Sequence, residues 1–323
     1  MKEYRIASLF GGIGGIDLGF EQAGAKSVWA NEIDKNCAIT FKSNHKDTEL
    51  VVDDICNIKG KDIPKIDILV GGFPCQPFSV AGYRKGFEDN RGNMFFEIIR
   101  LIHEMEKNNN KPKVVFLENV KNLYRHDKGR TYAKITSELE DMGYAVDSRI
   151  MNSAEYGNVP QNRERIFIVA FLNKDQFNKF KWPSKIKLTN TLNKLIDRDS
   201  LCDIKYYYQD DKKCYELLRE NMKSKSTIYQ YRRVYVRENK SNLCPTLTAN
   251  MGMGGHNVPL ILDNSNRIRK LTPRECLLLQ GFPKQFVIPE NLSDSSIYKQ
   301  AGNAVTVSVI KNVAKEIIKA LED

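Results

Sequence analysis

A single cysteine lies in an unusual turn of this sequence. In "GGFPCQPFSVAG" (residues 71–82), Cys75 stands between two prolines, directly after the apolar run "IDILVGG". An acid, Glu118, follows a second apolar run in "FLENV". A thiolate adds to electron-poor ring carbons, and a carboxyl group hydrogen-bonds the neighbouring ring nitrogen. For cytosine, addition at C6 with Glu118 bonded to N3 would turn C5 into a carbon nucleophile that accepts a methyl group.

A glycine-rich turn, "FGGIGG" (10–15), follows the first apolar run and precedes a helical stretch. It is not a G-x-G-x-x-G motif, because Asp17 stands where the last glycine would be, and this disfavours a dinucleotide pyrophosphate. Glu32 and Asp54 follow the next two apolar runs, where acids bind ribose hydroxyls and face an adenine amino group. The pattern predicts a nucleoside cofactor without a long phosphate chain; a glycine turn chosen for helix packing is the alternative.

The elements that must position these residues alternate between strand and helix. Strand-like runs such as "YRIASLF", "SVWAN", "DILVGG", "KVVFLEN" and "RIFIVAF" are separated by amphipathic stretches such as "MFFEIIRLIHEME". This alternation predicts an α/β domain with a parallel sheet covered by helices. The carboxyl ends of parallel strands meet at one edge, so Cys75 and Glu118 should converge beside the glycine turn. Either residue alone would more often be structural.

The domain organisation follows from a change in pattern after Leu172. A polar, Lys- and Tyr-rich region replaces the alternation there, and the last segment, "NAVTVSVIKNVAKEIIKALED", carries an apolar residue every four positions. We therefore expect a helix that returns to the first domain. The predicted domains are residues 1–175 completed by 297–323, and a smaller one at 176–296.

Charge and cysteine content narrow the class of protein. The net charge is +10, and residues 173–270 hold 20 Lys and Arg against 10 Asp and Glu, while the remainder holds 30 of each. Such an excess suits nucleic acid, with a lysine-rich solvated surface as the alternative. The seven scattered cysteines show no Cys-x-x-Cys pair, which predicts reduced thiols and no metal site. Without a membrane span or a signal peptide, a cytoplasmic protein is expected.

Taken together, the blocks resemble those of the DNA (cytosine-5)-methyltransferases of the bacterial restriction-modification type. The similarity covers nearly all of residues 4–172 and 267–313. It implies a Rossmann-like sheet that binds S-adenosyl-L-methionine (AdoMet), a second, smaller target-recognition domain, and double-stranded DNA as substrate. The matching blocks are "FGGIGG", "NEID", "GFPCQPFS", "RGNMFFEIIRLI", "FLENVKNL", "VPQNRERIFIVAF", "RKLTPRECLLLQGFP" and "YKQAGNAVTVSVI".

The resemblance implies four catalytic residues. Cys75 would add to cytosine C6, and Glu118 would contact N3 and the exocyclic amine. Arg165 would support the cytosine O2 and the thiolate, and Arg163 would help bind the active-site loop or a phosphate. Asn119 would brace the Pro-Cys turn.

The resemblance also implies a cofactor pocket. Phe10 would stack on the AdoMet adenine, Glu32 would hold the ribose, and Asp54 and Ile55 would flank the base. The predicted cofactor residues are Phe10, Gly12, Gly14, Glu32, Ile33, Asp54, Ile55, Pro74, Met94, Asn303 and Ala304.

DNA recognition requires the target base to leave the stack, because the faces of a paired cytosine are inaccessible. The basic region would hold the duplex, and its tyrosines at 229, 231 and 235 alternate as on one strand face. The arginines there could contact phosphates or guanine edges, and a plain phosphate contact or a solvated position is the more common case for each of them. The predicted DNA contacts are Gln76, Ser79, Arg232, Arg233, Arg237 and Thr246.

Two alternatives stay open from the sequence: an RNA (tRNA) cytosine-5 methyltransferase, and a catalytically silent DNA-binding relative. An enzyme acting on an amino nitrogen is disfavoured, because a thiol stands in "FPCQP". We expect a monomer, with a cognate restriction endonuclease, if one exists, acting separately.

Overall fold

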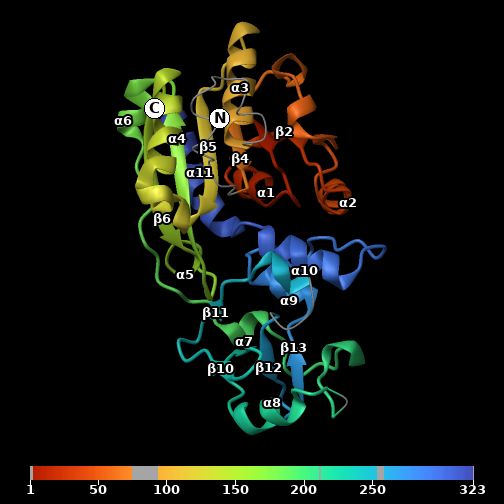
Figure 1. Cartoon of the computed structure of the whole chain (residues 1–323). Helices are drawn as coiled ribbons and strands as arrows, with labels where there is room; N and C mark the ends of the chain where they lie inside the picture. Colours follow the sequence, from red (N-terminus) through yellow and green to blue (C-terminus); the bar gives the residue numbers. More distant parts are fainter. Residues whose placement is uncertain (1–2, 75–93, 211, 253–257, 323) are drawn as a thin grey trace. The chain divides into compact units, whose positions relative to one another are not determined.

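The computed structural model describes residues 3–74, 94–210, 212–252 and 258–322, and the chain divides into two compact units (Figure 1). The first unit comprises Met1–Met151, Glu164–Ser184 and Ile310–Asp323. The second comprises Asn152–Arg163 and Lys185–Val309.

A seven-stranded sheet forms the first unit among the described residues, in the order β3-β2-β1-β4-β5-β8-β6. The neighbours from β3 to β5 are parallel, which confirms the α/β class. Strand β8 runs antiparallel to β5, so the expectation of a wholly parallel sheet was wrong at "RIFIVAF". The strands are β1 (Arg5–Leu9), β2 (Lys26–Asn31), β3 (Glu49–Val51), β4 (Ile68–Gly72), β5 (Val114–Val120), β6 (Ala145–Asn152) and β8 (Glu164–Phe171).

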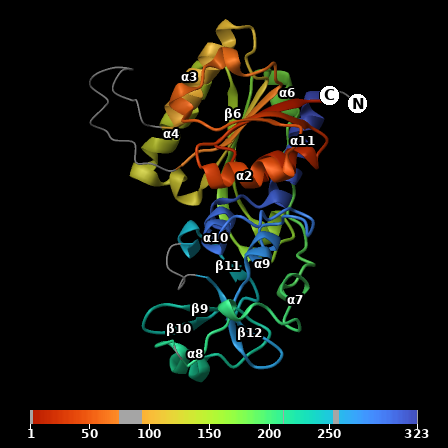
Figure 2. The same ribbon diagram turned by 90° about the vertical axis from the view of Figure 1, so that its right-hand side faces the viewer.

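Helices cover both faces of this sheet, with α3 and α4 on one side and α11 on the other (Figure 2). The apolar face of α3 is buried in the main core, where Ile98 and Leu101 are fully inaccessible. On the opposite face, Phe20 of α1 packs edge-on against Phe116. The helices of this unit are α1 (Gly15–Glu21), α2 (Lys35–Asn44), α3 (Met94–Lys107), α4 (Arg130–Asp141), α6 (Lys174–Lys179) and α11 (Val307–Glu322).

The predicted carboxy-terminal helix is confirmed as α11, and its apolar stripe is buried. From Ile310 onward it belongs to the first unit. Gly19 of α1 allows close packing there, because a Cβ at that position would lie 2.5 Å from Cγ2 of Ile310. From Ile310 onward the chain's last helix therefore packs within the first unit.

The second unit holds two small sheets, β10-β9-β12-β13 and β11-β7, among the residues that the structure describes. Its strands are β7 (Gln161–Asn162), β9 (Tyr229–Tyr231), β10 (Val236–Glu238), β11 (Cys244–Pro245), β12 (Leu260–Leu262) and β13 (Ile268–Lys270). Its helices are α5 (Ser153–Tyr156), α7 (Leu192–Leu195), α8 (Tyr215–Asn221), α9 (Pro273–Leu278) and α10 (Asp294–Asn303).

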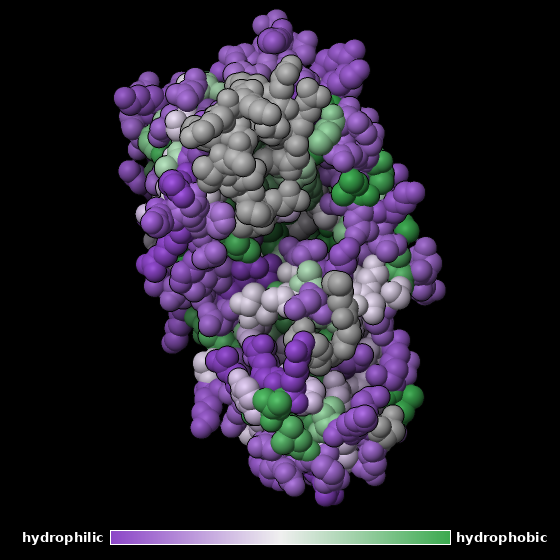
Figure 3. Space-filling model, viewed as in Figure 1, coloured by the Kyte–Doolittle hydropathy of each residue, from purple (hydrophilic) through white to green (hydrophobic). Residues whose placement is uncertain are grey.

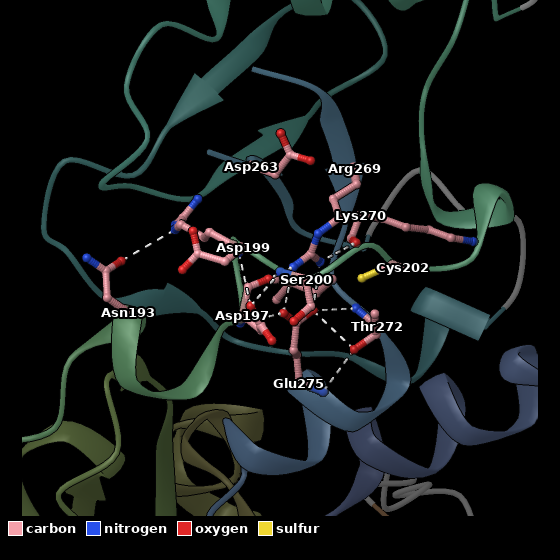
Figure 4. Close-up of polar contacts among 12 residues, drawn as sticks. Asn193, Asp197, Asp199, Ser200, Cys202, Asp263, Arg269, Lys270, Thr272 and Glu275 are labelled. Carbon is pink, nitrogen blue, oxygen red and sulfur yellow. Dashed lines mark hydrogen bonds and ion pairs between the residues drawn. The ribbon is translucent and has the colours of Figure 1, made fainter. Parts of the chain in front are cut away.

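A buried ion pair joins β13 to α9 in this unit (Figure 4). Both Nη atoms of Arg269 donate to Glu275 at 2.8 Å, and Arg269 is fully buried. Glu275 also accepts from the main-chain N–H of Thr272 at 2.7 Å and so completes a capping box at the start of α9. This network belongs to the framework of the unit.

The predicted domain boundaries differ from the observed units at three places. Residues 176–184, predicted for the second domain, belong to the first unit. Residues 152–163 belong to the second unit, because β7 pairs with β11. Residues 297–309 belong there as well, and they include most of α10, which packs beside α9 and Ala249–Gly252. Both segments looked like parts of the first domain in the sequence, since each lies next to one of its elements.

The surface, the cysteines and the helices were compared with what the composition indicates. The face in Figure 3 is largely hydrophilic, with separate apolar patches. The structure describes every cysteine except Cys75, and none of those described forms a disulfide. None of the helices within the described ranges has both the length and the apolar character that membrane crossing requires.

Candidate active site

Glu118 and Arg165 form an ion pair at one edge of the sheet. Glu118 lies near the end of β5, beside Gly72 of β4 and opposite Phe167 of β8. Its Oε1 lies 3.2 Å from Nε of Arg165, and both side chains are largely buried. The Nη1 of Arg165 also donates to the carbonyl of Glu164 at 2.8 Å. The antiparallel entry of β8 thus brings two predicted catalytic groups together.

Asn119 holds the main chain that enters the Pro-Cys turn. Its Nδ2 donates to the carbonyl of Phe73 at 2.9 Å, and its Oδ1 accepts from the N–H of Val120 at 2.8 Å. The bond to Phe73 agrees with the predicted bracing role of Asn119, and its role toward the Pro-Cys turn stays a prediction. Pro74 is exposed. Three predicted site residues, Cys75, Gln76 and Ser79, lie outside the described residues.

Glu32 closes the glycine turn at the end of β2. One carboxylate oxygen accepts from the N–H of Gly12 and the other from the N–H of Asp34, both at 2.7 Å. Gly12 has a φ of 57°, which favours glycine, and the preceding Phe10 also has a positive φ of 55°. The side chain of Asp34 then caps α2 by accepting from the N–H of Asn36 at 2.9 Å. A half-buried carboxylate at a strand end beside an open glycine turn fits a nucleoside.

The loop after β3 presents Asp54 but hides Ile55. Asp54 accepts from the N–H of Cys56 at 2.9 Å, and this bond lowers the pKa of the Asp54 carboxyl. The Ile55 side chain is buried in the core and 3% exposed, so any contact of this residue with a base would come from its main chain. By contrast, the side chain of Ile33 is 61% exposed, which is a large fraction for an apolar residue. Met94 opens α3 and packs against the same core.

Two buried polar residues near the glycine turn have structural roles that the sequence did not indicate. Asn31, 2% exposed, donates to the carbonyls of Val51 (3.2 Å) and Asp53 (2.8 Å) and thereby ties β2 to the loop after β3. Asp17 accepts from the hydroxyl of Ser27 at 2.7 Å, and burial raises the pKa of its carboxyl. For Asn31 the available signal was its place directly before Glu32, the acid predicted to bind the ribose.

Arg163 has a position that differs from the prediction. It is 2% exposed in the second unit, where its guanidinium donates to the carbonyls of Leu247, Gly302 and Ala304. All three bonds are made to main-chain carbonyls of the second unit, so Arg163 braces the main chain of that unit. Contact with the active-site loop or a phosphate stays a prediction without support from this geometry.

A β-hairpin carries the predicted DNA-reading arginines. Arg232 and Arg233 lie in the turn between β9 and β10, Arg237 lies on β10, and all three are exposed. Arg233 has a φ of 63°, and the turn interrupts the strand. Tyr235 is 53% exposed in this turn, so the prediction that it shares a strand face with Tyr229 was wrong.

The remaining predicted contacts lie in the second unit. Thr246 donates its hydroxyl to the carbonyl of Asn162 at 2.6 Å. Asn303 is exposed at the end of α10, and Ala304 follows it as the cap. Their assignments to DNA and to the cofactor stay predictions.

Comparisons with known proteins identify the family. The C-5 cytosine-specific DNA methylase family matches residues 4–319. The Type II methyltransferase M.Bsp6I of Bacillus sp. (strain RFL6) is 54% identical over 320 residues, which cover 98% of this chain and 99% of the relative. The Type II methyltransferase M.HaeII of Haemophilus aegyptius is 39% identical over 323 residues, which cover 99% and 95%.

The fold has solved counterparts as well. The crystal structure of S. pombe Dnmt2 methyltransferase superposes with a TM-score of 0.75 at 19% identity, covering 99% of this chain and 100% of that chain. At this identity the likeness concerns the fold alone. The RNA enzyme and the silent relative are therefore not favoured by the comparisons. The chain belongs to the C-5 cytosine-specific DNA methylase family and is a DNA (cytosine-5)-methyltransferase.

Proposed function

We propose that the enzyme methylates C5 of a flipped-out cytosine in a short specific sequence of duplex DNA, through a covalent bond between Cys75 and C6. The observation that carries this proposal is the Glu118–Arg165 pair, 3.2 Å apart. Glu118 is followed on β5 by Asn119, which donates to the carbonyl of Phe73, two residues before Cys75 in the sequence. A thiol entering the site at that point would meet a carboxylate and a guanidinium on one side.

Each catalytic residue has a distinct task in this proposal. The Cys75 sulfur adds to C6 and breaks the aromaticity of the ring, while Glu118 hydrogen-bonds N3 and the exocyclic amine. The electron density that collects on the ring makes C5 nucleophilic. Arg165 stays charged and donates in a fixed fork, which suits the cytosine O2. Loss of the C5 proton and of the sulfur then regenerates an aromatic ring.

The family uses a methyl donor, and we propose that the donor is AdoMet bound at the carboxyl ends of β1 to β3. When bound, AdoMet supplies an electrophilic methyl group from its sulfonium. Glu32 would hold the ribose hydroxyls, and the exposed Ile33 and Asp54 would face the adenine. The glycine turn at Gly12 leaves the main chain open to a ligand, because a Cβ there would meet, among the described residues, only the Phe10 carbonyl at 4.0 Å.

Replacing Glu32 by glutamine should weaken AdoMet binding about 10- to 100-fold, the scale of a lost hydrogen bond to a charged group. Both carboxylate oxygens accept from main-chain N–H groups. In the glutamine variant the amide NH₂ would stand opposite one of these N–H groups, and that hydrogen bond would be lost. The measurement is KM for AdoMet together with Kd for DNA, which should change less than about threefold. Glu49→Gln, at an exposed residue of β3, is the matched control. Equal losses for the two ligands would contradict a ribose role.

The biological setting is proposed from the names of the relatives, which are Type II methyltransferases. We propose that the enzyme acts as a monomer in the cytoplasm, within a restriction-modification system whose endonuclease is a separate protein. Bisulfite sequencing of DNA methylated by the purified enzyme will give the target sequence. Methyl incorporation into duplex DNA should greatly exceed that into tRNA; the reverse would overturn the choice of substrate.

The hairpin turn supplies a test of how DNA is read. If Arg233 contacts a guanine edge, Arg233→Ala should cost about 5- to 150-fold in affinity and relax the preference at one base pair. If it contacts a phosphate, binding should weaken equally on all sequences, and the slope of log K against log salt should fall by about one. Arg219→Ala on α8 is the control, because Arg219 is exposed and pairs with Glu216 at 2.8 Å. Wild-type binding by both variants would exclude the hairpin from the DNA contact.

A further inference from the structure

Arg163 joins two segments that are far apart in the sequence. Its Nη1 donates to the Leu247 carbonyl at 2.8 Å. Its Nη2 donates to the carbonyls of Gly302 at 3.2 Å and Ala304 at 2.6 Å. One buried guanidinium therefore holds the main chain of the segment 246–248, next to the predicted DNA contact Thr246, and that of the segment 302–304.

The same two segments are in direct contact. A Cβ on Gly302 would lie 2.2 Å from the carbonyl carbon of Thr248 and 2.4 Å from the main-chain nitrogen of Ala249. Real Cβ atoms do not approach main chain so closely, so only glycine fits at this point of α10. A displacement of 246–248 must therefore displace the end of α10 as well.

Buried glutamines complete the connection. The Oε1 of Gln161 accepts from the N–H of Leu247 at 3.1 Å, and its Nε2 donates to Oε1 of Gln280 at 3.1 Å. Gln280 in turn donates to the carbonyl of Ala301 at 2.7 Å. Both glutamines are fully buried. Polar groups that are buried and mutually bonded resist independent movement, because any break leaves an unsatisfied group.

We propose that Arg163 is a positioning residue that couples DNA binding to cofactor binding. The inference rests on the proposed function and on two contacts predicted from the sequence, that of Thr246 with DNA and that of Asn303 and Ala304 with AdoMet. A duplex that fixes the segment 246–248 also fixes 302–304, so each ligand strengthens binding of the other by the same factor. An arginine suits this task, because its planar fork spans several carbonyls, which a lysine ammonium does not.

The test is the factor by which a saturating duplex lowers Kd for S-adenosylhomocysteine, measured by isothermal titration. The duplex carries the target sequence obtained by bisulfite sequencing. For the wild-type enzyme the factor should be at least about fivefold, the lower end of typical coupling between sites. In Arg163→Lys it should fall close to one; because the factor compares two Kd values of the same variant, a change in Kd without DNA does not by itself alter it.

Arg198→Lys is the matched control, because Arg198 is another buried arginine of the second unit that holds main chain. It is 7% exposed and donates to the carbonyls of Leu262 at 2.6 Å and Thr227 at 3.1 Å, away from the two segments. We expect it to lower Tm but to keep the wild-type factor. Should Arg163→Lys fail to fold, Thr246→Val is the second variant. It removes the exposed hydrogen bond from the Thr246 hydroxyl to the carbonyl of Asn162, the residue before Arg163, and should at least halve the factor.

Three results would overturn the inference. They are a factor of one in a wild-type enzyme that methylates normally, an unchanged factor in folded Arg163→Lys or in Thr246→Val, and an equal loss in Arg198→Lys. A wild-type enzyme that neither methylates DNA nor binds S-adenosylhomocysteine would contradict the proposed function instead.

Discussion

Replacing Cys75 by alanine is expected to abolish methylation of duplex DNA while DNA binding persists. Without the sulfur no bond to C6 forms, and C5 keeps the low reactivity of an aromatic ring carbon. Removal of a nucleophile typically costs on the order of 10⁴- to 10⁶-fold in rate. Transfer of labelled methyl groups measures the rate, and a gel-shift assay measures binding.

A covalent trap makes the same prediction sharper. A duplex with 5-fluorocytosine at the target base should form a stable adduct with the wild-type enzyme and none with Cys75→Ala. Cys202→Ala is the control, since burial raises the pKa of the Cys202 thiol and leaves less thiolate at neutral pH. Wild-type turnover by Cys75→Ala, or an adduct in that variant, would refute the covalent mechanism.

The second large effect is expected for Glu118→Gln, with a loss of about 10²- to 10⁴-fold in kcat. Glutamine keeps the size of the side chain but presents a neutral amide to N3 and the exocyclic amine of cytosine. It also removes the charge that faces Arg165 at 3.2 Å in a largely buried pair. Breaking one partner of such a pair leaves the other charge uncompensated.

Kinetics and binding separate the catalytic contribution from a structural one. Because the proposed role of Glu118 is in the addition step, kcat should fall far more than KM for AdoMet changes. Glu164→Gln is the control: Glu164 neighbours Arg165 in sequence but pairs with Lys121 at 2.8 Å at the surface, where ion pairs contribute little. A fall in kcat as large in Glu164→Gln as in Glu118→Gln would show that only the local charge matters.

The class of chemistry and the alternation of strands and helices were readable from the sequence, because both depend on local residue types. A thiol between prolines, acids after apolar runs and a glycine turn each lie within a few residues of the element that positions them. The α/β class was therefore predicted, and the returning helix α11 with it. The bond from Asn119 to the Phe73 carbonyl agrees with the bracing role that the family resemblance implied for this residue.

Tertiary structure decided the direction of β8, the boundary between the units and the position of Arg163. Apolar runs are alike in parallel and antiparallel strands, so "RIFIVAF" carried no sign of its direction. The segment 152–163 belongs to the second unit because two-residue β7 pairs with β11, a pairing too short to leave a periodic pattern. Arg163 bonds to main-chain carbonyls, which every residue possesses, and only the folded chain selects which of them it meets.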